Sequence, residues 1–497
     1  MQSAVSRFAF DREKHGVAAF EAIAVVTTVL VLPIALYVGH VAEYGRILYP
    51  AANVLLAYYL FQRRSPWYAG HCLLLFCCVS LARRLVDEQA GWDPSNPILL
   101  TPYLCCLATV ASFFKYWSQR SPVHIGTFVV LLACIAYGVV LAMLNGRMLA
   151  SMVDALKWSV GPLFAVYVLA NRERLPEIRN VIEPCLIWAG TAMSVYGIAQ
   201  FLDPPSWDAY WMRNVLELGL NTIGRPEPFA VRVFSTMNSP GSFGIVLTAA
   251  IVVALKRSLP VTSLTVPLML LGLALCQYRS IWAATAIAVA MVLMFSRGGG
   301  VRPANIIALA IIGFALSSIV AVPRIQETIV HRATSLTKLG GDASLESRLH
   351  QYAALARADE LVAGEGLAIS GISRRLDRQL PKEMDGAFIE IWRSMGVIVG
   401  TLFLLSLATF VASLFSYSPA SGPHLFFDRA IVVSTLVQLP IGSVHIGELG
   451  FCAWMFIGFG LAARMNGSQQ SISRPPAASR GQDRFSTHAL SRPLNEA

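Results

Sequence analysis

Long apolar runs, separated mostly by short polar connections, make up the hydrophobic pattern of this 497-residue chain. Most runs are long enough to cross, as a helix, a hydrocarbon core about 30 Å thick. A helix also satisfies its own backbone hydrogen bonds, which lipid cannot do. The pattern therefore predicts an all-α fold. We expect a polytopic integral membrane protein with about 12–14 transmembrane helices and two long extracytoplasmic loops.

The apolar runs locate about fourteen candidate spans. The first half contains Ala18–Gly39, Ile47–Phe61, Tyr68–Ala82, Ile98–Phe114, Val123–Leu144, Met152–Ala170 and Val181–Phe201. The second half contains Gly241–Leu255, Val261–Gln277, Ile281–Phe295, Asn305–Val322, Ala387–Phe415, Ala430–Val444 and Leu449–Ala463. Two connections are long, at Leu202–Ser239 and Pro323–Gly386.

Lysine and arginine residues divide unevenly between the two sets of connections, and the excess normally marks the cytoplasmic side. One set holds twelve of them: Arg63, Arg64, Lys115, Arg120, Arg172, Arg174, Arg179, Lys256, Arg257, Arg297, Arg302 and Arg429. The other set holds five: Arg46, Arg83, Arg84, Arg147 and Arg279. The first set is therefore predicted to be cytoplasmic. Both long loops then lie outside and both termini inside.

This topology divides the chain into segments with distinct expected roles. They are a cytoplasmic N-terminus (1–17), N-terminal transmembrane helices (18–201), a first outer loop (202–239), central transmembrane helices (240–322), a large second outer loop (323–386), C-terminal transmembrane helices (387–463) and a cytoplasmic tail (464–497). The tail is rich in Ser, Gln, Arg and Pro, which predicts disorder. The N-terminal apolar run is too long for a cleavable signal and lacks a small-x-small cleavage site.

Composition narrows the function classes further. Charged residues make up 14% of the chain and hydrophobic residues 55%. The formal net charge of +10 comes mostly from the predicted cytoplasmic connections and the tail, so it does not indicate nucleic-acid binding. All nine cysteines lie in apolar runs, and no cluster of metal ligands or nucleotide-binding glycine motif is visible. We expect no metal, no other cofactor and no structural disulfide in the long loops.

Both outer loops carry arginines, whose planar guanidinium binds phosphate oxygens in pairs and stays charged. The first loop contains Arg213, Arg225 and Arg232, and the second contains Arg332 and Arg348 among others. Acidic residues balance the second loop, with nine Lys/Arg against nine Asp/Glu. Any anion site there must therefore be built by folding. Surface ion pairing is the alternative role for each loop arginine.

Two further features lie where apolar runs meet the outer side. Arg279 stands between two runs with almost no loop, and an arginine so close to hydrocarbon tends to be functional. Snorkelling to the interface is the alternative. Asn238-Ser239-Pro240-Gly241 is a turn into a membrane helix, and such a turn can present backbone N–H groups to an anion. A purely structural helix start is the alternative.

Five short motifs follow one another over about residues 225–400. They are Arg232-x-Phe234 with Asn238-x-Pro240 and Gly244, Arg279-Ser280-x-Trp282, Ser344-x-x-x-Arg348-x-x-x-Tyr352-x-x-Leu355, Gly364-x-Gly366, and Asp385-Gly386-x-x-Ile389 with Gly396 and Gly400. Their order and membrane placement resemble those of the O-antigen ligase / polysaccharide polymerase family of bacterial membrane glycosyltransferases.

One departure from the family pattern bears on the chemistry. Family ligases place a His-Asn pair where this chain has Asp385-Gly386. Many polymerase-like members carry a carboxylate there. The resemblance therefore favours a polymerase over a ligase, with Asp385 as the base and Glu383 and Glu390 as reserves. The alternative role for Asp385 is that of a helix N-cap.

The resemblance implies a donor glycan on undecaprenyl pyrophosphate at the outer leaflet of the bacterial cytoplasmic (inner) membrane. The acceptor hydroxyl belongs to a second lipid-linked repeat unit. Asp385 would act as general base, and Arg279 and Arg348 would stabilise charge on the leaving pyrophosphate. Further substrate contacts are expected from Arg232, Asn238, Arg225, Arg213, Arg332 and Glu390. Expected partners are membrane lipid and, in the same pathway, a chain-length regulator and a flippase.

Three alternatives stay open. A ligase would transfer a finished glycan to a lipid A core or a protein. A transporter or flippase usually carries ionisable residues or broken helices at mid-membrane; the predicted spans hold few charges, of which Asp154 and Lys157 are the main ones. A non-catalytic assembly scaffold is the third alternative.

Overall fold

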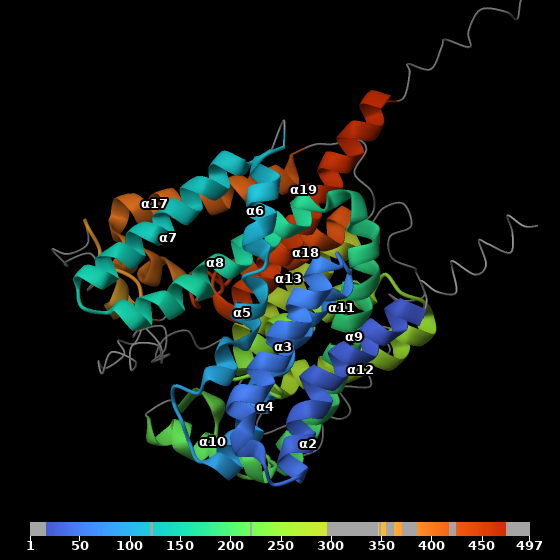
Figure 1. Ribbon diagram of the computed structural model, residues 1–497, viewed down its shortest axis with the longest axis vertical. Coiled ribbons are helices and arrows are strands. Elements are labelled where there is room, and N and C mark those ends of the chain that lie inside the picture. The colour runs from blue at the N-terminus through green and yellow to red at the C-terminus, as the bar shows by residue number, and fades with distance from the viewer. Residues whose placement is uncertain are drawn as a thin grey trace, which may run out of the picture.

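The computed structural model describes residues 16–119, 123–218, 221–295, 346, 349–353, 362–369, 384, 386–416 and 424–473. Helices make up most of these residues (Figure 1). The α-helices are α2 (Leu32–Val38), α3 (Gly45–Gln62), α4 (Trp67–Ala90), α5 (Thr101–Cys106), α6 (Thr109–Trp117), α7 (Ile125–Leu144), α8 (Met148–Ala170), α9 (Leu175–Leu202), α10 (Ser206–Glu217), α11 (Pro240–Ala254), α12 (Leu259–Leu275), α13 (Arg279–Phe295), α17 (Ala387–Phe415), α18 (His424–Leu436) and α19 (Gly447–Ser473).

The predicted all-α polytopic membrane fold is confirmed by the length and composition of these helices. Within the described residues, eight helical stretches are long and apolar enough to cross a membrane: Gly16–Val38, Trp67–Ala90, Pro97–Trp117, Ile125–Leu144, Met148–Ala170, Arg172–Leu202, Ala387–Phe415 and Gly447–Gly467. Three apolar helices are shorter: Pro240–Ala254, Leu259–Leu275 and Arg279–Met294. The predicted span Asn305–Val322 lies outside the described residues.

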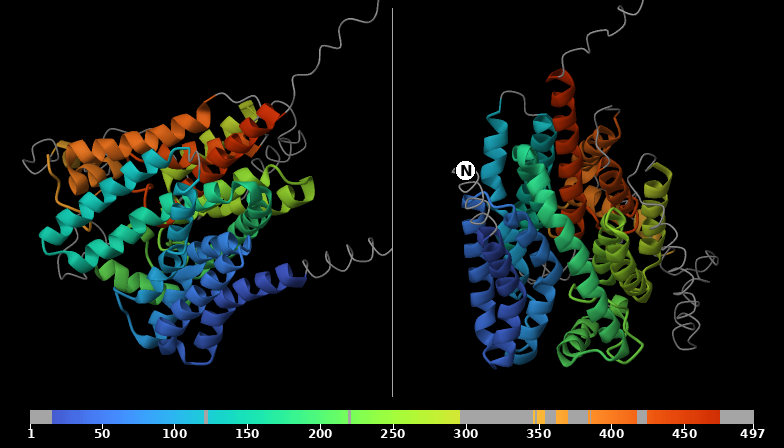
Figure 2. Two further views of the ribbon diagram at one scale, coloured as in Figure 1. Left: turned by 45° about the horizontal axis from the view of Figure 1, so that its top comes forward. Right: turned by 90° about the vertical axis from the view of Figure 1, so that its right-hand side faces the viewer.

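Small residues let the central helices approach closely. Helices α8 and α19 pack along each other, and a side chain at Gly161 would collide with the ring of Trp454. On the same interface, Gly458 lies against the backbone of Ala165. Such glycine contacts replace the hydrophobic driving force that helices lack inside lipid. Helices α7 and α17 also lie side by side, as the left view of Figure 2 shows.

Connections gather on two faces of the bundle. One face, called the loop face below, carries residues 202–239, where α10 lies at the bottom of Figure 1, together with the starts of α17 and α19. A hydrogen bond of 2.9 Å from Ser242 to Glu448 joins the starts of α11 and α19 there. The opposite face carries the short basic connections, such as that of Arg172. That the loop face is the outer one stays a prediction.

The predicted span Tyr68–Ala82 was too short. Helix α4 continues to Ala90, and Arg83 and Arg84, which the sequence assigned to a connection, are buried in it. Both are neutralised by carboxylates: Arg83 lies 2.9 Å from Asp87 one turn on, and Arg84 lies 2.9 Å from Asp208. The paired charges allow the helix to continue where the hydropathy pattern ends.

Charges inside the bundle are also more numerous than Asp154 and Lys157. At the opposite face a second buried cluster joins three helices: Arg179 and Glu183 of α9, Lys256 after α11, and Asp428 of α18. Lys256 Nζ lies 2.6 Å from Glu183. Each of these charges has a partner of opposite sign, and this pairing offsets part of the free-energy cost of removing the charges from water.

Candidate functional site

The stretch 232–239 of the first loop is fastened to α4 by one buried arginine. Arg84 donates hydrogen bonds to the carbonyl oxygens of Ser235 and Met237, the latter at 2.7 Å. Its Nε lies 2.9 Å from the Asp208 carboxylate of α10, and both side chains are fully buried. The guanidinium is therefore occupied by the protein itself and positions the loop backbone.

A second set of hydrogen bonds completes this anchor. The Asp208 carboxylate also accepts from the Tyr196 hydroxyl, at 2.7 Å, and from the Gln200 amide. The Gln200 side-chain oxygen accepts the backbone N–H of Ser235 at 2.9 Å. These bonds hold Ser235 at a φ of +55°, a left-handed conformation that costs free energy for a non-glycine residue. Burial raises the pKa of Asp208, and the Arg84 charge opposes that rise.

A cavity of about 250 Å³ lies at the loop face, where the anchored stretch ends. It is bounded by α4, the connection after it, α5, α8, residue 238 and the start of α19. Its polar lining residues are Ser80, Ser95, Asn96, Tyr103, Lys157, Asn238 and Glu448. Pockets for drug-sized ligands measure about 300–1,000 Å³. The cavity is therefore smaller than a typical pocket for a whole drug-sized ligand.

Three polar groups of different chemistry face this cavity. Asn238 Oδ1 is buried and accepts no hydrogen bond from the described residues. The Glu448 carboxylate accepts from Ser242 at 2.9 Å. Lys157 Nζ lies 2.9 Å from Asp154, and its side chain is 27% exposed. An amide oxygen, a carboxylate and an ammonium together can accept from and donate to hydroxyl groups.

Residues 362–369 of the second loop are also built into the bundle. Leu367, which is fully buried, donates its backbone N–H to the Gly138 carbonyl of α7 at 2.8 Å. Arg147, the residue before α8, donates to the carbonyl oxygens of Glu365 and Ala368. This part of the second loop is therefore a packed segment between α7, α8 and α17.

Glycines make this insertion possible. Gly366 has a φ of +87°, and a side chain there would lie 2.2 Å from the backbone nitrogen of Ala142. Gly396 interrupts α17 with a φ of +74°, where a side chain would lie 2.2 Å from the Val362 carbonyl. Only glycine fits such close approaches with positive φ. The kink in α17 is thus the place where the second loop enters the bundle.

The predicted site residues lie in different surroundings. Arg213 and Arg225 are exposed. Arg232 donates to the Thr222 carbonyl at 3.2 Å within the first loop. Arg279 is the half-buried first residue of α13.

Only one of the predicted residues that the structure describes lines the cavity, namely Asn238. Glu390 is buried in the first turn of α17. Asp385, Arg348 and Arg332, together with Glu383, lie outside the described residues.

Several residues of this region were not predicted from the sequence. Glu448 stands in Gly447-Glu448-Leu449-Gly450 before the last apolar run, and an acidic residue at that position was a usable signal. The spacing of Arg83 and Asp87, four apart, was also readable as a helical ion pair. The ion pair of Arg84 with Asp208 could not be predicted from the sequence, because it joins distant parts of the chain.

Within the described part of the chain, no group of three or more His, Cys, Asp or Glu side chains could hold a metal ion. No protein-family model, no curated protein and no solved structure matches this chain.

Proposed function

We propose that this chain is a membrane glycosyltransferase that polymerises oligosaccharide repeat units carried on polyprenyl pyrophosphate, with the reaction at the loop face. The observation that carries the proposal is the buried oxygen of Asn238 in the loop-face cavity, which no described residue pairs. Asn238 closes the stretch 232–238 on which the family resemblance begins. A buried unpaired acceptor costs about 1–3 kcal/mol, and a substrate hydroxyl donated to it would recover that free energy.

The polar lining of the cavity supports a hydroxyl-rich substrate. Glu448 and Asn238 can accept hydrogen bonds from sugar hydroxyls, and Lys157 can donate to a ring or glycosidic oxygen. Tyr103 and Phe76 add aromatic surface to the lining. Sites for small molecules commonly combine such apolar walls with a few placed polar groups.

The proposed reaction moves one proton and breaks one bond. A carboxylate takes the proton of the acceptor hydroxyl, and the freed oxygen attacks the anomeric carbon of the donor. The bond from that carbon to the pyrophosphate oxygen breaks, and the pyrophosphate leaves with the electron pair. Asp385 remains the base that the resemblance favours. Glu448 is a second candidate, because it is the carboxylate that lines the cavity. Arg279 would stabilise the leaving group.

The test uses purified protein in liposomes. Lipid-linked oligosaccharides are extracted from the parent organism lacking this gene, and the products are separated by length. Wild-type protein should form a ladder of multiples of the repeat unit. Asn238→Ala should slow the reaction about 10-fold, as expected for one lost hydrogen bond. Asn214→Ala is the matched control, because Asn214 lies in α10 away from the cavity lining.

The base is assigned in the same assay. Asp385→Asn and Glu448→Gln keep shape but remove the proton acceptor, and loss of a general base slows a reaction about 10²–10⁴-fold. We expect one of the two variants to lose activity to that extent while still inserting normally. Transfer only to a lipid A core acceptor would make the protein a ligase. Movement of the lipid-linked units across the membrane without any elongation would refute the proposal in favour of a flippase.

A further inference from the structure

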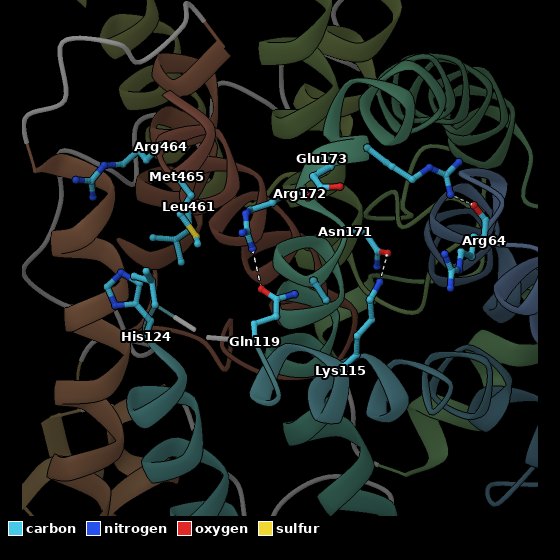
Figure 3. A pocket seen from close by; sticks show the side chains of 13 residues that line it. Arg64, Lys115, Gln119, His124, Asn171, Arg172, Glu173, Leu461, Arg464 and Met465 are labelled. Atoms are coloured by element: carbon cyan, nitrogen blue, oxygen red, sulfur yellow. Dashed lines mark hydrogen bonds between the residues drawn. The ribbon is translucent and has the colours of Figure 1, made fainter. Parts of the chain in front are cut away.

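A second cavity lies at the opposite face, away from the proposed chemistry. It measures about 830 Å³ and is lined from five places: the connections after α3 and α8, the end of α6, the start of α7 and the end of α19 (Figure 3). Four of the stretches that are long and apolar enough to cross a membrane begin or end here, namely Pro97–Trp117, Ile125–Leu144, Met148–Ala170 and Gly447–Gly467. If they cross a membrane, their ends lie at its surface, which places the cavity within reach of lipid headgroups.

The charge of this opposite-face cavity is strongly positive. Five cationic side chains line it, namely Arg64, Lys115, Arg172, Arg174 and Arg464, against one carboxylate, that of Glu173. Arg174 also pairs with Glu177 outside the lining, which leaves four cations against one carboxylate. Glu173 is exposed. In the loop-face cavity, by contrast, the one lysine, Lys157, is balanced by one carboxylate, that of Glu448. An accumulation of like charge around a hollow raises the local concentration of anions.

Two of these cations, Arg172 and Lys115, form hydrogen bonds with neutral side chains. Arg172 donates to the Gln119 side chain at 2.9 Å, and Lys115 lies 3.4 Å from the Asn171 side chain, as the dashed lines in Figure 3 show. Within the described residues neither forms an ion pair with a carboxylate. The Nε of Arg172 is buried and has no acceptor among them. Both side chains therefore keep donors and charge for a further anionic partner.

The protein also holds Arg172 in place. Its backbone carbonyl accepts a hydrogen bond from Asn466 of α19 at 2.9 Å, which ties the connection after α8 to the end of that helix. Preorganised donors bind an anion with less loss of side-chain entropy than mobile surface lysines. The arrangement in Figure 3 thus goes beyond a scattered excess of basic residues.

Apolar side chains complete the lining. Val123, Leu461 and Met465 lie next to the cations. A soluble phosphate gains no free energy from contact with apolar surface. The glycerol backbone and first methylenes of a phospholipid do gain free energy when they are buried against it. Basic pockets between transmembrane helices are known to bind anionic headgroups.

We infer that the opposite-face cavity binds a phosphate group, and that its source is the headgroup of an anionic phospholipid. Arg172 and Lys115 contact the phosphate oxygens, and Leu461 and Met465 contact the start of the acyl chains. The bound lipid joins α6, α8 and α19 at the face opposite the proposed reaction. This site does not depend on the proposed function of the loop face.

Native mass spectrometry of the delipidated full-length protein tests the inference. The probes are phosphatidylglycerol, phosphatidylcholine as the zwitterionic comparison, and inorganic phosphate or pyrophosphate as competitors. Wild-type protein should bind one phosphatidylglycerol at least 10-fold more tightly than phosphatidylcholine. Arg172→Gln should weaken phosphatidylglycerol binding about 10-fold, the loss expected for one hydrogen bond to a charged group. Lys115→Gln is the second variant, should Arg172→Gln fail to fold.

Arg63→Gln is the matched control, because Arg63 is an exposed arginine of the same face outside the cavity lining. It should bind phosphatidylglycerol like the wild type. Equal binding of both lipids, or equal loss in the control, would overturn the inference. Displacement of phosphatidylglycerol by millimolar inorganic phosphate or pyrophosphate, with the same dependence on Arg172, would overturn the lipid source and identify a soluble anion instead.

Discussion

Each of the two long loops is held to the bundle by an arginine near the end of a helix. The two attachments differ in how the charges around the arginine are balanced. In the first loop, Arg84 holds the carbonyls of Ser235 and Met237, and the loop itself supplies Asp208 as counter-charge. This anchor is fully buried. It resembles a small folded core with its own neutralising pair.

In the second loop the corresponding arginine is Arg147, which holds the carbonyls of Glu365 and Ala368. Here the Glu365 carboxylate is bound by Arg393 of α17. The segment 362–369 is therefore held mainly through its backbone and through glycines that fit against neighbouring helices.

In this chain the arginines that organise a loop do not lie in the loop itself. The loop arginines attract attention because they are surrounded by polar sequence, yet Arg213 and Arg225 are exposed. The arginines that organise the loops stand at the ends of membrane helices. Their donors bind carbonyl oxygens, so their first role is to position loop backbone.

Removing Asp208 should have the largest effect on this arrangement. Asp208→Ala leaves Arg84 buried without its counter-charge, which typically costs about 3–5 kcal/mol. We expect a correspondingly lower free energy of unfolding in detergent, together with faster proteolysis of the first loop. Asp203→Ala is the matched control, because Asp203 is exposed at the end of α9. Equal destabilisation by the two variants would contradict the buried anchor.

Replacing Arg147 should have a smaller and more local effect. Lysine keeps the charge of Arg147 but cannot hold two carbonyls with one planar group. Arg147→Lys should cost about 1.5–3 kcal/mol, the range for a hydrogen bond from a charged donor. Hydrogen exchange should rise in residues 362–369 and stay unchanged in 232–239. If both stretches opened together, the loops would form one cooperative unit and the comparison would fail.

Acidification tests the packing between α8 and α17, the helices against which the second loop is inserted. His445 is buried against Trp158 of α8 and Phe403 of α17. The centroid of its ring lies 4.6 Å from that of Trp158 and 6.0 Å from that of Phe403. Burial lowers the pKa of His445 to about 3, whereas an unfolded histidine titrates near pH 6.5. Between these values the unfolded chain binds the extra proton, so stability falls as the pH falls.

The contribution of His445 between pH 7 and 5.5 should be about 1 kcal/mol. His445→Gln should remove it, which is measured as a shallower loss of melting temperature over that pH range. An unaltered slope in His445→Gln would show that this ring is not the group that titrates.

The smallest expected effect on stability belongs to the exposed arginines of the first loop. Arg213→Gln and Arg225→Gln should change the free energy of unfolding by less than about 0.5 kcal/mol. Their effect on polymer formation is the informative measurement. A large loss of activity with unchanged stability would restore the phosphate-binding role that the sequence suggested for them.

Much of the fold could be predicted, because apolar length alone decides which segments cross lipid. The error at α4 has a physical origin: hydropathy counts Arg84 as a charge to be exposed, whereas the folded protein neutralises it with Asp208. The site was harder to predict. Asn238 stood in a visible turn motif, but its place beside Glu448 and Lys157 depends on how α8, α11 and α19 pack.

The Arg84 anchor also constrains how the protein is assembled on the ribosome. Arg84 and its counter-charge Asp208 are 124 residues apart in the chain (208 − 84). At a synthesis rate of about 5–20 residues per second, Asp208 emerges about 6–25 s after Arg84. During that interval the end of α4 must keep an unneutralised guanidinium at the membrane surface. The final depth of α4 is therefore set only after α9 and the first loop have been translated, so that insertion and maturation of this helix are separate events.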